Sequence, residues 1–310
     1  MSDVVAVPRI LSEDGKKYLK NHGMHIVELD DMSGESIVKQ AADVDGIILL
    51  TDPFPNEIFA KMKNLKVIAR HGVGYENVNP EFAAKHGVWL TITPNANAST
   101  VAETTLAAIL DLSKNLTKVS NDMMAGTFQD KHIGFDLEGK NIGIMGYGRI
   151  GRMLAQKISG LGMNVLIYDP YITETNIGKI VDRDTLLRKS DIISLHMLVT
   201  PETEKSINKD AFKKMKNSAL LINYGRGALV EEQDMIKALK DHEILGAALD
   251  VYDEEPLPLS SDLYKLDNVL LTPHVASFTK ECMSRMAVDA ASEVVRVLSG
   301  KKPKWNVNKK

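Results

Sequence analysis

Short apolar runs rich in branched side chains alternate with polar or amphipathic segments of helical length along the first 95 residues. Such runs are typical of buried strands, and the segments between them are typical of helices that cover a sheet. A repeated alternation of strand and helix predicts a parallel sheet with helices on its faces. The expected strands are residues 4–7, 25–29, 46–50, 66–70 and 88–92. The first part of the chain is therefore predicted to be a small α/β domain.

A second alternation of the same kind begins at residue 141. Its expected strands are residues 141–145, 164–168, 191–196, 218–223, 245–250 and 268–272. Six such strands with helices between them predict a six-stranded doubly wound parallel sheet.

Two long helices are expected where these alternations meet. Thr100 and Glu103 have the spacing of a capping box and would open one helix, while Thr279 would cap another that stops at Gly300. The chain is therefore expected to cross between two domains twice. We predict one domain from residues 99–279 and a discontinuous one from residues 1–98 and 280–310.

The connection after the strand at residues 141–145 carries a glycine-rich turn. Gly146, Gly148 and Gly151 lie at the start of a helix expected over residues 149–159. Glycines at these positions permit a tight turn, close approach of the backbone to a pyrophosphate, and close packing of the helix on the sheet. The pyrophosphate would lie over the positive end of this helix.

Asp169 ends the next expected strand, 18 residues after Gly151. A carboxylate there can accept hydrogen bonds from ribose hydroxyls and would repel a 2′-phosphate. A glycine run alone also marks ordinary turns, but the flanking strands, the helix and the acidic residue together favour a dinucleotide site. The sequence therefore predicts NAD as the cofactor, in preference to NADP.

Composition narrows the class of protein further. The length of 310 residues suits two domains, and the net charge of −3 gives no reason to expect a nucleic-acid partner. The start shows no signal peptide, and no apolar run is long enough to span a membrane. Cys282 is the only cysteine, which fits a cytoplasmic protein. Since no cluster of histidine, cysteine and carboxylate has zinc spacing, we expect no metal.

Arg226, Glu255 and His274 each follow one of the last three expected strands. Ligands of doubly wound sheets bind at the carboxyl ends of the strands, so these side chains are expected on one rim. Arginine can grip a carboxylate bidentately, histidine can pass a proton near neutral pH, and a carboxylate can hold its ring. The trio suits hydride transfer to or from a 2-hydroxy or 2-keto acid. Taken singly, each residue also has an ordinary structural explanation.

The chain resembles the NAD-dependent D-isomer-specific 2-hydroxyacid dehydrogenases, the family that includes D-3-phosphoglycerate dehydrogenase and hydroxypyruvate reductase. The resemblance runs nearly end to end and includes the glycine turn and the three rim segments. Further matching segments are residues 70–78, 101–103, 195–196 and 200–203. Several independent matches in the same order make the resemblance far more specific than the glycine run alone.

This resemblance implies roles for the rim residues. Arg226 would bind the substrate carboxylate, and Glu255 would pair with the catalytic His274. A loop of the first domain would offer backbone amides to the same carboxylate, from Gly72, Val73 and Gly74.

The resemblance also implies further contacts with NAD. Asp250 would contact the nicotinamide carboxamide, and Arg149 and Ile150 would contact the pyrophosphate. Thr100 and Tyr224 would line the cofactor cleft.

The architecture implied by the resemblance is a central Rossmann domain inserted into a flavodoxin-like substrate domain built from both termini, in a homodimer. The regulatory domain of long phosphoglycerate dehydrogenases is not expected after the second crossing helix. The implied reaction transfers a hydride between NAD and C2 of a small D-2-hydroxy acid, with glyoxylate, hydroxypyruvate and 3-phosphoglycerate as candidate substrates.

Several questions stay open at this stage. Arg70 could bind a second anion such as a phosphate, or it could pack at the end of its strand or grip the same carboxylate. Phe278 could restrict the pocket. For His196 a structural or cofactor-shelf role is favoured over proton transfer. An NAD-sensing protein of the corepressor type, without turnover, would keep the same three rim residues.

Overall fold

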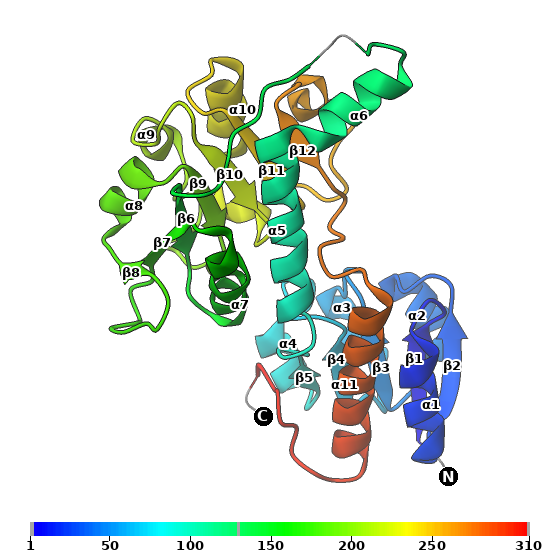
Figure 1. The fold of residues 1–310 in the computed structure, drawn as a ribbon. Helices are drawn as coiled ribbons and strands as arrows, with labels where there is room; N and C mark the ends of the chain where they lie inside the picture. Colours follow the sequence, from blue (N-terminus) through cyan, green and yellow to red (C-terminus); the bar gives the residue numbers. More distant parts are fainter. Residues whose placement is uncertain (1–2, 129–130, 309–310) are drawn as a thin grey trace. The chain divides into compact units, whose positions relative to one another are not determined.

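The computed structural model describes residues 3–128 and 131–308, which form two compact units (Figure 1). The terminal unit consists of Met1–Asn97 and Ser277–Lys310, and the central unit consists of Ala98–Ala276. Each unit has its own parallel sheet and its own hydrophobic core.

The sheet of the terminal unit has the strand order β2-β1-β3-β4-β5, and all its printed pairings are parallel. This is the flavodoxin-like doubly wound order. The five strands confirm the runs expected from the sequence: β1 (Val4–Pro8), β2 (His25–Leu29), β3 (Gly46–Leu49), β4 (Val67–Arg70) and β5 (Trp89–Thr91).

Helices cover both faces of this sheet (Figure 1). On one face, α1 (Glu13–Asn21) and α11 (Lys280–Leu298) pack against β1, β3 and β4 through residues such as Leu19, Val294 and Val67. The core of the other face includes residues of α2 (Gly34–Ala41), α3 (Asn56–Phe59) and α4 (Pro80–Lys85).

The C-terminal segment completes the terminal unit. Thr91 of β5 forms an antiparallel bridge with Asn306, and Val307 N–H donates to the Leu90 carbonyl oxygen at 2.9 Å. The expectation that the chain's end returns to the first domain's fold thus has a concrete basis in backbone pairing.

The central unit contains a seven-stranded parallel sheet with the order β12-β11-β10-β9-β6-β7-β8. The strands are β6 (Asn141–Met145), β7 (Asn164–Tyr168), β8 (Lys179–Ile180), β9 (Ile192–Leu195), β10 (Leu220–Asn223), β11 (Gly246–Leu249) and β12 (Val269–Leu271). The prediction of six strands was wrong by one, because β8 is only two residues long and carries no apolar run that sequence reading could detect.

Two helical layers enclose this sheet. One core contains residues of α5 (Ala98–Lys114) and α7 (Arg149–Ile158), which pack against each other. The other contains residues of α8 (Arg183–Lys189), α9 (Lys209–Phe212) and α10 (Glu232–Lys240). The helix α6 (Leu116–Met124) follows α5 and has no buried residue. Short 3₁₀ turns occur at Ser159–Leu161, Gly227–Leu229 and Asp262–Lys265.

The two expected helix caps differ in outcome. Thr279 does cap α11, since its side chain accepts a hydrogen bond from Cys282 N–H, and Gly300 follows the helix with φ +75°. The capping box at Thr100 was wrong, because α5 begins at Ala98 and Thr100 lies inside it. Glu103 instead accepts a hydrogen bond from the Ser99 hydroxyl at 3.1 Å.

None of the helices in the described ranges is long and apolar enough to cross a membrane.

Candidate active site

The glycine turn after β6 leaves no room for side chains at two of its positions. Gly146 has φ +91°, a conformation that favours glycine, and a Cβ atom there would lie 2.6 Å from the carbonyl carbon of His196. A Cβ atom on Gly151 would lie 2.3 Å from the Gly146 oxygen. Glycine is therefore required at both positions for α7 to start this close to the sheet.

Gly148 differs from the other two glycines. It is the residue before α7, and a Cβ atom on it would meet nothing within 4 Å. The structure thus offers open backbone at Gly148 and, directly after it, the N-terminal turn with Arg149 and Ile150. Backbone amides at a helix N-terminus are the favoured binding site for a pyrophosphate.

The sheet order changes direction next to this turn, because β6 lies between β7 and β9. In doubly wound sheets, ligands bind outside the carboxyl ends of the strands at such a switch point. The glycine turn follows β6 directly and therefore lies where the fold predicts a dinucleotide.

Asp169 follows β7 and faces the glycine turn. One carboxylate oxygen accepts a hydrogen bond from Tyr147 N–H at 2.7 Å, and the other accepts one from Tyr171 N–H at 2.9 Å. The carboxylate that is expected to accept hydrogen bonds from the ribose hydroxyls is therefore held in place by two backbone amides. Together with the open Gly148, this arrangement fits NAD.

The loop after β10 places Arg226. Asn223 is buried, and its side chain accepts from Gly225 N–H at 3.2 Å and donates to the Arg226 carbonyl at 2.9 Å. A Cβ atom on Gly227 would lie only 2.0 Å from the Tyr252 oxygen, so this loop touches the loop that follows β11. The sequence motif thus has a physical basis: asparagine shapes the turn, and glycine lets the two loops meet.

His274 and Glu255 form a hydrogen-bonded pair. The Nδ1 atom of His274 lies 2.7 Å from Oε2 of Glu255, and the two side chains are 40% and 35% exposed. Glu255 Oε1 accepts a second hydrogen bond, from Tyr252 N–H at 3.1 Å. An ionised Glu255 fixes the proton on Nδ1, which leaves Nε2 for a ligand.

Several groups act on the ionisation of Glu255. Burial is the largest influence and raises the pKa of its carboxyl group. The hydrogen bond and charge of His274, the Tyr252 N–H and the charge of Arg226 together outweigh burial, so the pKa lies below its usual value. The three residues Arg226, Glu255 and His274 are thus electrostatically connected within the central unit.

Asp250 holds the backbone that carries His274. It is 1% exposed, and its carboxylate accepts from the Thr272 hydroxyl at 2.6 Å, Val275 N–H at 2.8 Å and Ala276 N–H at 2.9 Å. His274 between these donors has φ +54°, an unusual conformation for a residue with a side chain. The expected contact of Asp250 with the nicotinamide carboxamide stays a prediction, whereas its support of the His274 loop was not foreseen.

The remaining expected cofactor residues lie in packed surroundings. Tyr224 is 5% exposed and belongs to the core between the sheet and the helices α5 and α7, and Thr100 of α5 is 4% exposed. Burial is the main reason that the pKa of Tyr224 is raised, so its hydroxyl keeps its proton.

His196 lies at the end of β9, next to Gly146. Its backbone N–H donates to the Met145 oxygen at 2.7 Å, and its Nε2 atom lies 2.8 Å from the Ser194 hydroxyl. Burial lowers the pKa of His196 to about 4, so the ring is neutral at neutral pH. A neutral ring suits a structural or cofactor-shelf role, which the sequence also favours, and does not suit proton transfer.

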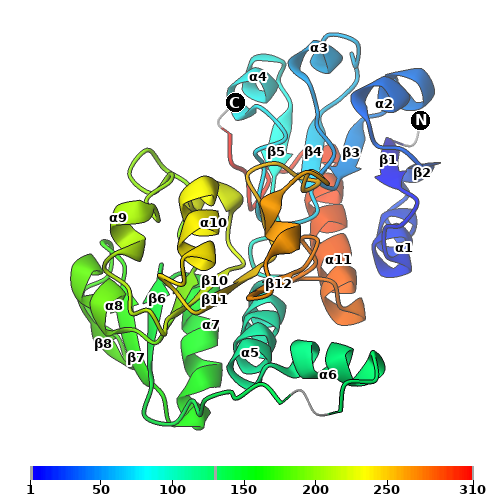
Figure 2. The same cartoon turned by 90° about the horizontal axis from the view of Figure 1, so that it is seen from above.

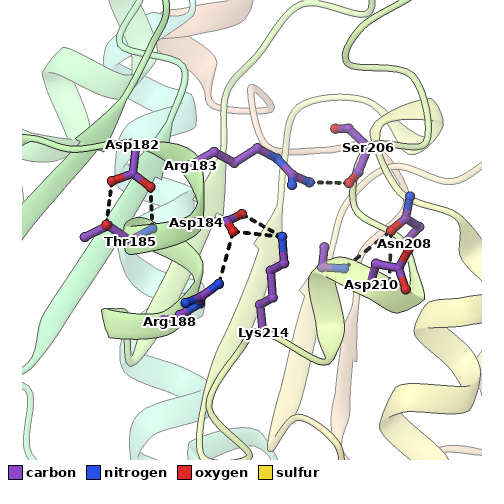
Figure 3. Close-up of polar contacts among 10 residues, drawn as sticks. Asp182, Arg183, Asp184, Thr185, Arg188, Ser206, Asn208, Asp210 and Lys214 are labelled. Atoms are coloured by element: carbon purple, nitrogen blue, oxygen red, sulfur yellow. Dashed lines mark hydrogen bonds and ion pairs between the residues drawn. The ribbon is translucent and has the colours of Figure 1, made fainter.

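The loop that follows β9 is tied down at its far end (Figure 3). The Arg183 guanidinium donates to the Ser206 oxygen, and the Asn208 side chain accepts from backbone amides at the start of α9. Asp184 of α8 pairs with Lys214 at 2.7 Å, which links α8 to the segment after α9. These contacts hold the end of the loop against α8 and the start of α9.

Gly72, Val73 and Gly74 follow β4 in the terminal unit. Gly72 has φ +150°, and its carbonyl oxygen accepts from Thr93 N–H at 2.8 Å. The proposed amide contacts of this loop with substrate stay a prediction. Sequence reading did not single out Asn77, whose side chain donates to the carbonyls of Leu50 and Asp52 at 3.2 and 2.6 Å.

Across the described ranges, no group of three or more histidine, cysteine, aspartate and glutamate residues is arranged to hold a metal ion. The polar chemistry of the central unit instead combines a dinucleotide turn with an arginine and a histidine–glutamate pair on the same sheet edge. Such a combination defines the class of nicotinamide-dependent dehydrogenases.

Comparison with known proteins identifies the family. Residues 106–276 match "D-isomer specific 2-hydroxyacid dehydrogenase, NAD binding domain". A glyoxylate reductase of Thermofilum pendens is 39% identical over 319 residues, which cover 98% of this chain and 94% of the relative. The chain therefore belongs to the D-isomer specific 2-hydroxyacid dehydrogenase family and is an NAD-dependent enzyme.

Two further relatives differ in how much of their length is matched. A D-3-phosphoglycerate dehydrogenase of Archaeoglobus fulgidus is 34% identical over 97% of this chain, but the chain spans only 58% of that relative. The match to the solved structure of the TT0316 protein of Thermus thermophilus covers 98% of this chain and 99% of that protein's chain, with 32% sequence identity and a TM-score of 0.91.

Proposed function

We propose that this enzyme reduces a small 2-keto acid such as glyoxylate or hydroxypyruvate to the D-2-hydroxy acid, using NADH. The observation that carries the proposal is the 2.7 Å pair of His274 with Glu255, on the same rim as Arg226. The glyoxylate reductase of Thermofilum pendens, matched over 94% of its length, supports a small acid. Nothing in the comparisons supports the alternative of an NAD-sensing protein without turnover.

The residues of the central unit have distinct tasks in this reaction. Arg226 binds the substrate carboxylate through its planar guanidinium, which places the keto group. His274 holds a proton on Nε2 and delivers it to the carbonyl oxygen, while Glu255 accepts the Nδ1 hydrogen bond and stabilises the charged ring. Bound NADH supplies the hydride. In the reverse direction, neutral His274 accepts the proton from the hydroxyl group.

A screen of NADH oxidation tests the substrate. It would compare glyoxylate, hydroxypyruvate, pyruvate, longer 2-keto acids and phosphohydroxypyruvate by kcat/KM, and we expect glyoxylate or hydroxypyruvate to rank first. With the best acid, His274→Ala should lower kcat by ~10²- to 10⁴-fold while the Kd for NADH stays unchanged. His25→Ala, an exposed histidine of β2, is the matched control. NADH binding without turnover of any acid would contradict the proposal.

We also propose that the enzyme is a homodimer that pairs through α6 and the described residues after it, 125–128 and 131–133. Figures 1 and 2 show α6 continuing beyond α5 and away from the sheet of the central unit. Large apolar side chains are exposed there, including Met124 at 86% and Ile133 at 96%. The other large apolar residues that are exposed in these segments are Leu116, Met123 and Phe128. A concentration of exposed apolar side chains of this kind favours a protein partner, and a second copy offers the same surface.

Sedimentation equilibrium tests the pairing. The unmodified protein should sediment as a dimer at micromolar concentration, and Met124→Lys combined with Phe128→Lys should shift it to monomer. Ile10→Lys changes an apolar residue of the terminal unit that is about as exposed as Phe128, at 69% against 68%, and should leave the dimer intact. A dimer that survives the double substitution would place the interface elsewhere.

A further inference from the structure

We propose that Arg70 is a positioning residue that holds the Gly72–Gly74 loop in shape, and that it does not read a phosphate. The substrate acid is accordingly unphosphorylated. This inference rests on the proposed function for its substrate class, whereas the support of the loop by Arg70 can be tested without turnover.

The Arg70 side chain is bonded to the backbone of its own unit. Arg70 ends β4, where it pairs with Leu49 of β3. Its Nη1 atom donates to the Leu49 carbonyl oxygen at 2.6 Å, and its Nε atom donates to the Gly74 oxygen at 3.0 Å. The guanidinium therefore links the end of the neighbouring strand to the far end of the glycine loop.

The carbonyl group of Gly72 is also held by hydrogen bonds. The Gly72 oxygen accepts from both the backbone N–H and the hydroxyl of Thr93, at 2.8 and 3.2 Å. With its carbonyls at Gly72 and Gly74 bonded to the protein, the loop presents its amide groups for other partners. In the described part of the chain, the N–H groups of Val73 and Gly74 have no hydrogen-bond acceptor. Adjacent backbone amides without acceptors form an anion-binding concavity that suits a carboxylate.

The same contacts argue against a phosphate on Arg70. The residue is 5% exposed, and the donors to Gly74 and Leu49 lie on different nitrogens of the guanidinium. A phosphate bound by the Nε and Nη1 donors would displace the Gly74 and Leu49 carbonyls and leave these acceptors without donors, which carries a free-energy penalty. It would also remove the Arg70 hydrogen bond that holds the Gly74 end of the loop.

Steady-state kinetics of Arg70→Lys and Arg70→Met separate the two roles. A lysine keeps the charge but has no planar fork to bridge two carbonyls, and a methionine removes the donors with little change in volume. We expect both variants to raise KM at least ~10-fold for glyoxylate, hydroxypyruvate and phosphohydroxypyruvate alike. The ratio of kcat/KM between the phosphorylated and unphosphorylated acids should change by less than about two-fold. Lys63→Met, an exposed basic residue of the same unit, should change nothing.

The contrary result is a selective loss. If Arg70→Met lowers kcat/KM at least ~10-fold for phosphohydroxypyruvate and leaves glyoxylate unchanged, Arg70 reads the phosphate and the inference is overturned. Equally, an unmodified enzyme that prefers phosphohydroxypyruvate would overturn the assignment of an unphosphorylated substrate.

Amide hydrogen exchange of the full-length protein keeps the support of the loop separate from the proposed function. Both variants should exchange faster than the unmodified protein in residues 70–76, with unchanged exchange in residues 141–151 of the central unit. Unchanged exchange in residues 70–76 would overturn the positioning role, whatever the enzyme reduces. Faster exchange in a protein that turns over no 2-keto acid would instead contradict the proposed function alone.

Discussion

Glu255 is the residue through which acid pH is expected to act on this site. Its pKa is lowered, because the His274 hydrogen bond, a backbone N–H and the charge of Arg226 outweigh the large opposing effect of burial. A carboxyl group whose pKa is lowered by folding stabilises the folded state fully at pH values above its unfolded-state pKa. That contribution is lost as the pH falls through the folded-state pKa. The pair therefore stays assembled at pH values where an ordinary glutamate, with a pKa of ~4.3, begins to take up a proton.

This ionisation leads to a prediction for the pH profile. The acid limb of kcat/KM that belongs to Glu255 should lie below the ordinary glutamate range and should disappear in Glu255→Gln. The variant should also lose ~10²- to 10⁴-fold in kcat, because an amide can orient the imidazole in the wrong tautomer. Steady-state rates between pH 3.5 and 8 measure both effects. Glu254→Gln, an exposed neighbour, should behave as the unmodified enzyme, and an acid limb near pH 6 would contradict this account.

At the scale of elements, the connection from β6 to α7 contains glycines that are needed for two different reasons. Gly151 is confined by the Gly146 oxygen, whereas Gly148 has open space where a side chain would begin. Gly151 therefore serves packing within the protein alone. Gly148 is expected to serve the approach of the cofactor.

Alanine substitutions distinguish the packing role of Gly151 from the cofactor role of Gly148. Gly151→Ala should lower the free energy of unfolding by ~1–3 kcal/mol, because a backbone atom must move. Gly148→Ala should change that free energy by less than about 1 kcal/mol and raise the Kd for NADH at least ~10-fold. Denaturant unfolding and fluorescence titration with NADH measure the two quantities. Gly160→Ala has open space and lies away from the turn, so neither quantity should change. Normal NADH binding by Gly148→Ala would contradict the expected path of the pyrophosphate.

At the scale of the whole molecule, the last residues of the chain complete a sheet that the first residues begin. Asn308 is buried, and its side chain accepts from Leu90 N–H at 2.8 Å and donates to the Val88 oxygen at 2.8 Å. The stability of the terminal unit therefore depends on residues more than 200 positions apart in the sequence.

Asn308→Ala should destabilise the terminal unit by ~1–3 kcal/mol, because it leaves a buried donor and a buried acceptor unpaired. Hydrogen exchange should become faster in residues 88–92 and stay unchanged in residues 141–145 of the central unit. Lys301→Ala, at an exposed position nearby, provides the control. Equal acceleration in both segments would mean that the two units unfold as one.

The two α/β sheets could be predicted because each long strand is an apolar run between polar segments. The pattern failed where an element is too short to show one, as for Lys179–Ile180 of β8. It also failed at Thr100, because threonine and glutamate three residues apart occur inside helices as well as at their starts. Periodicity records burial, and burial alone does not mark the first residue of a helix.

The candidate site, too, could be predicted from the sequence only in part. The sequence placed Arg226, Glu255 and His274 on one rim, and the structure brings Glu255 and His274 to 2.7 Å. It did not reveal that Asn223 shapes the Arg226 turn or that Asp250 holds the His274 loop, since these contacts join side chains to backbone atoms. Backbone donors are present at every residue, so no residue type in the sequence marks which of them a carboxylate will bind.

Asp169 couples the choice of cofactor to the integrity of the turn. The carboxylate expected to face the ribose already accepts hydrogen bonds from Tyr147 N–H and Tyr171 N–H. Replacing it with a small neutral or basic residue, to admit a 2′-phosphate, would strip both amides of their acceptor. Redesigning the enzyme for NADPH therefore requires at least two changes. One change must allow the 2′-phosphate to bind, and another must restore a hydrogen-bond acceptor for the backbone amides of Tyr147 and Tyr171.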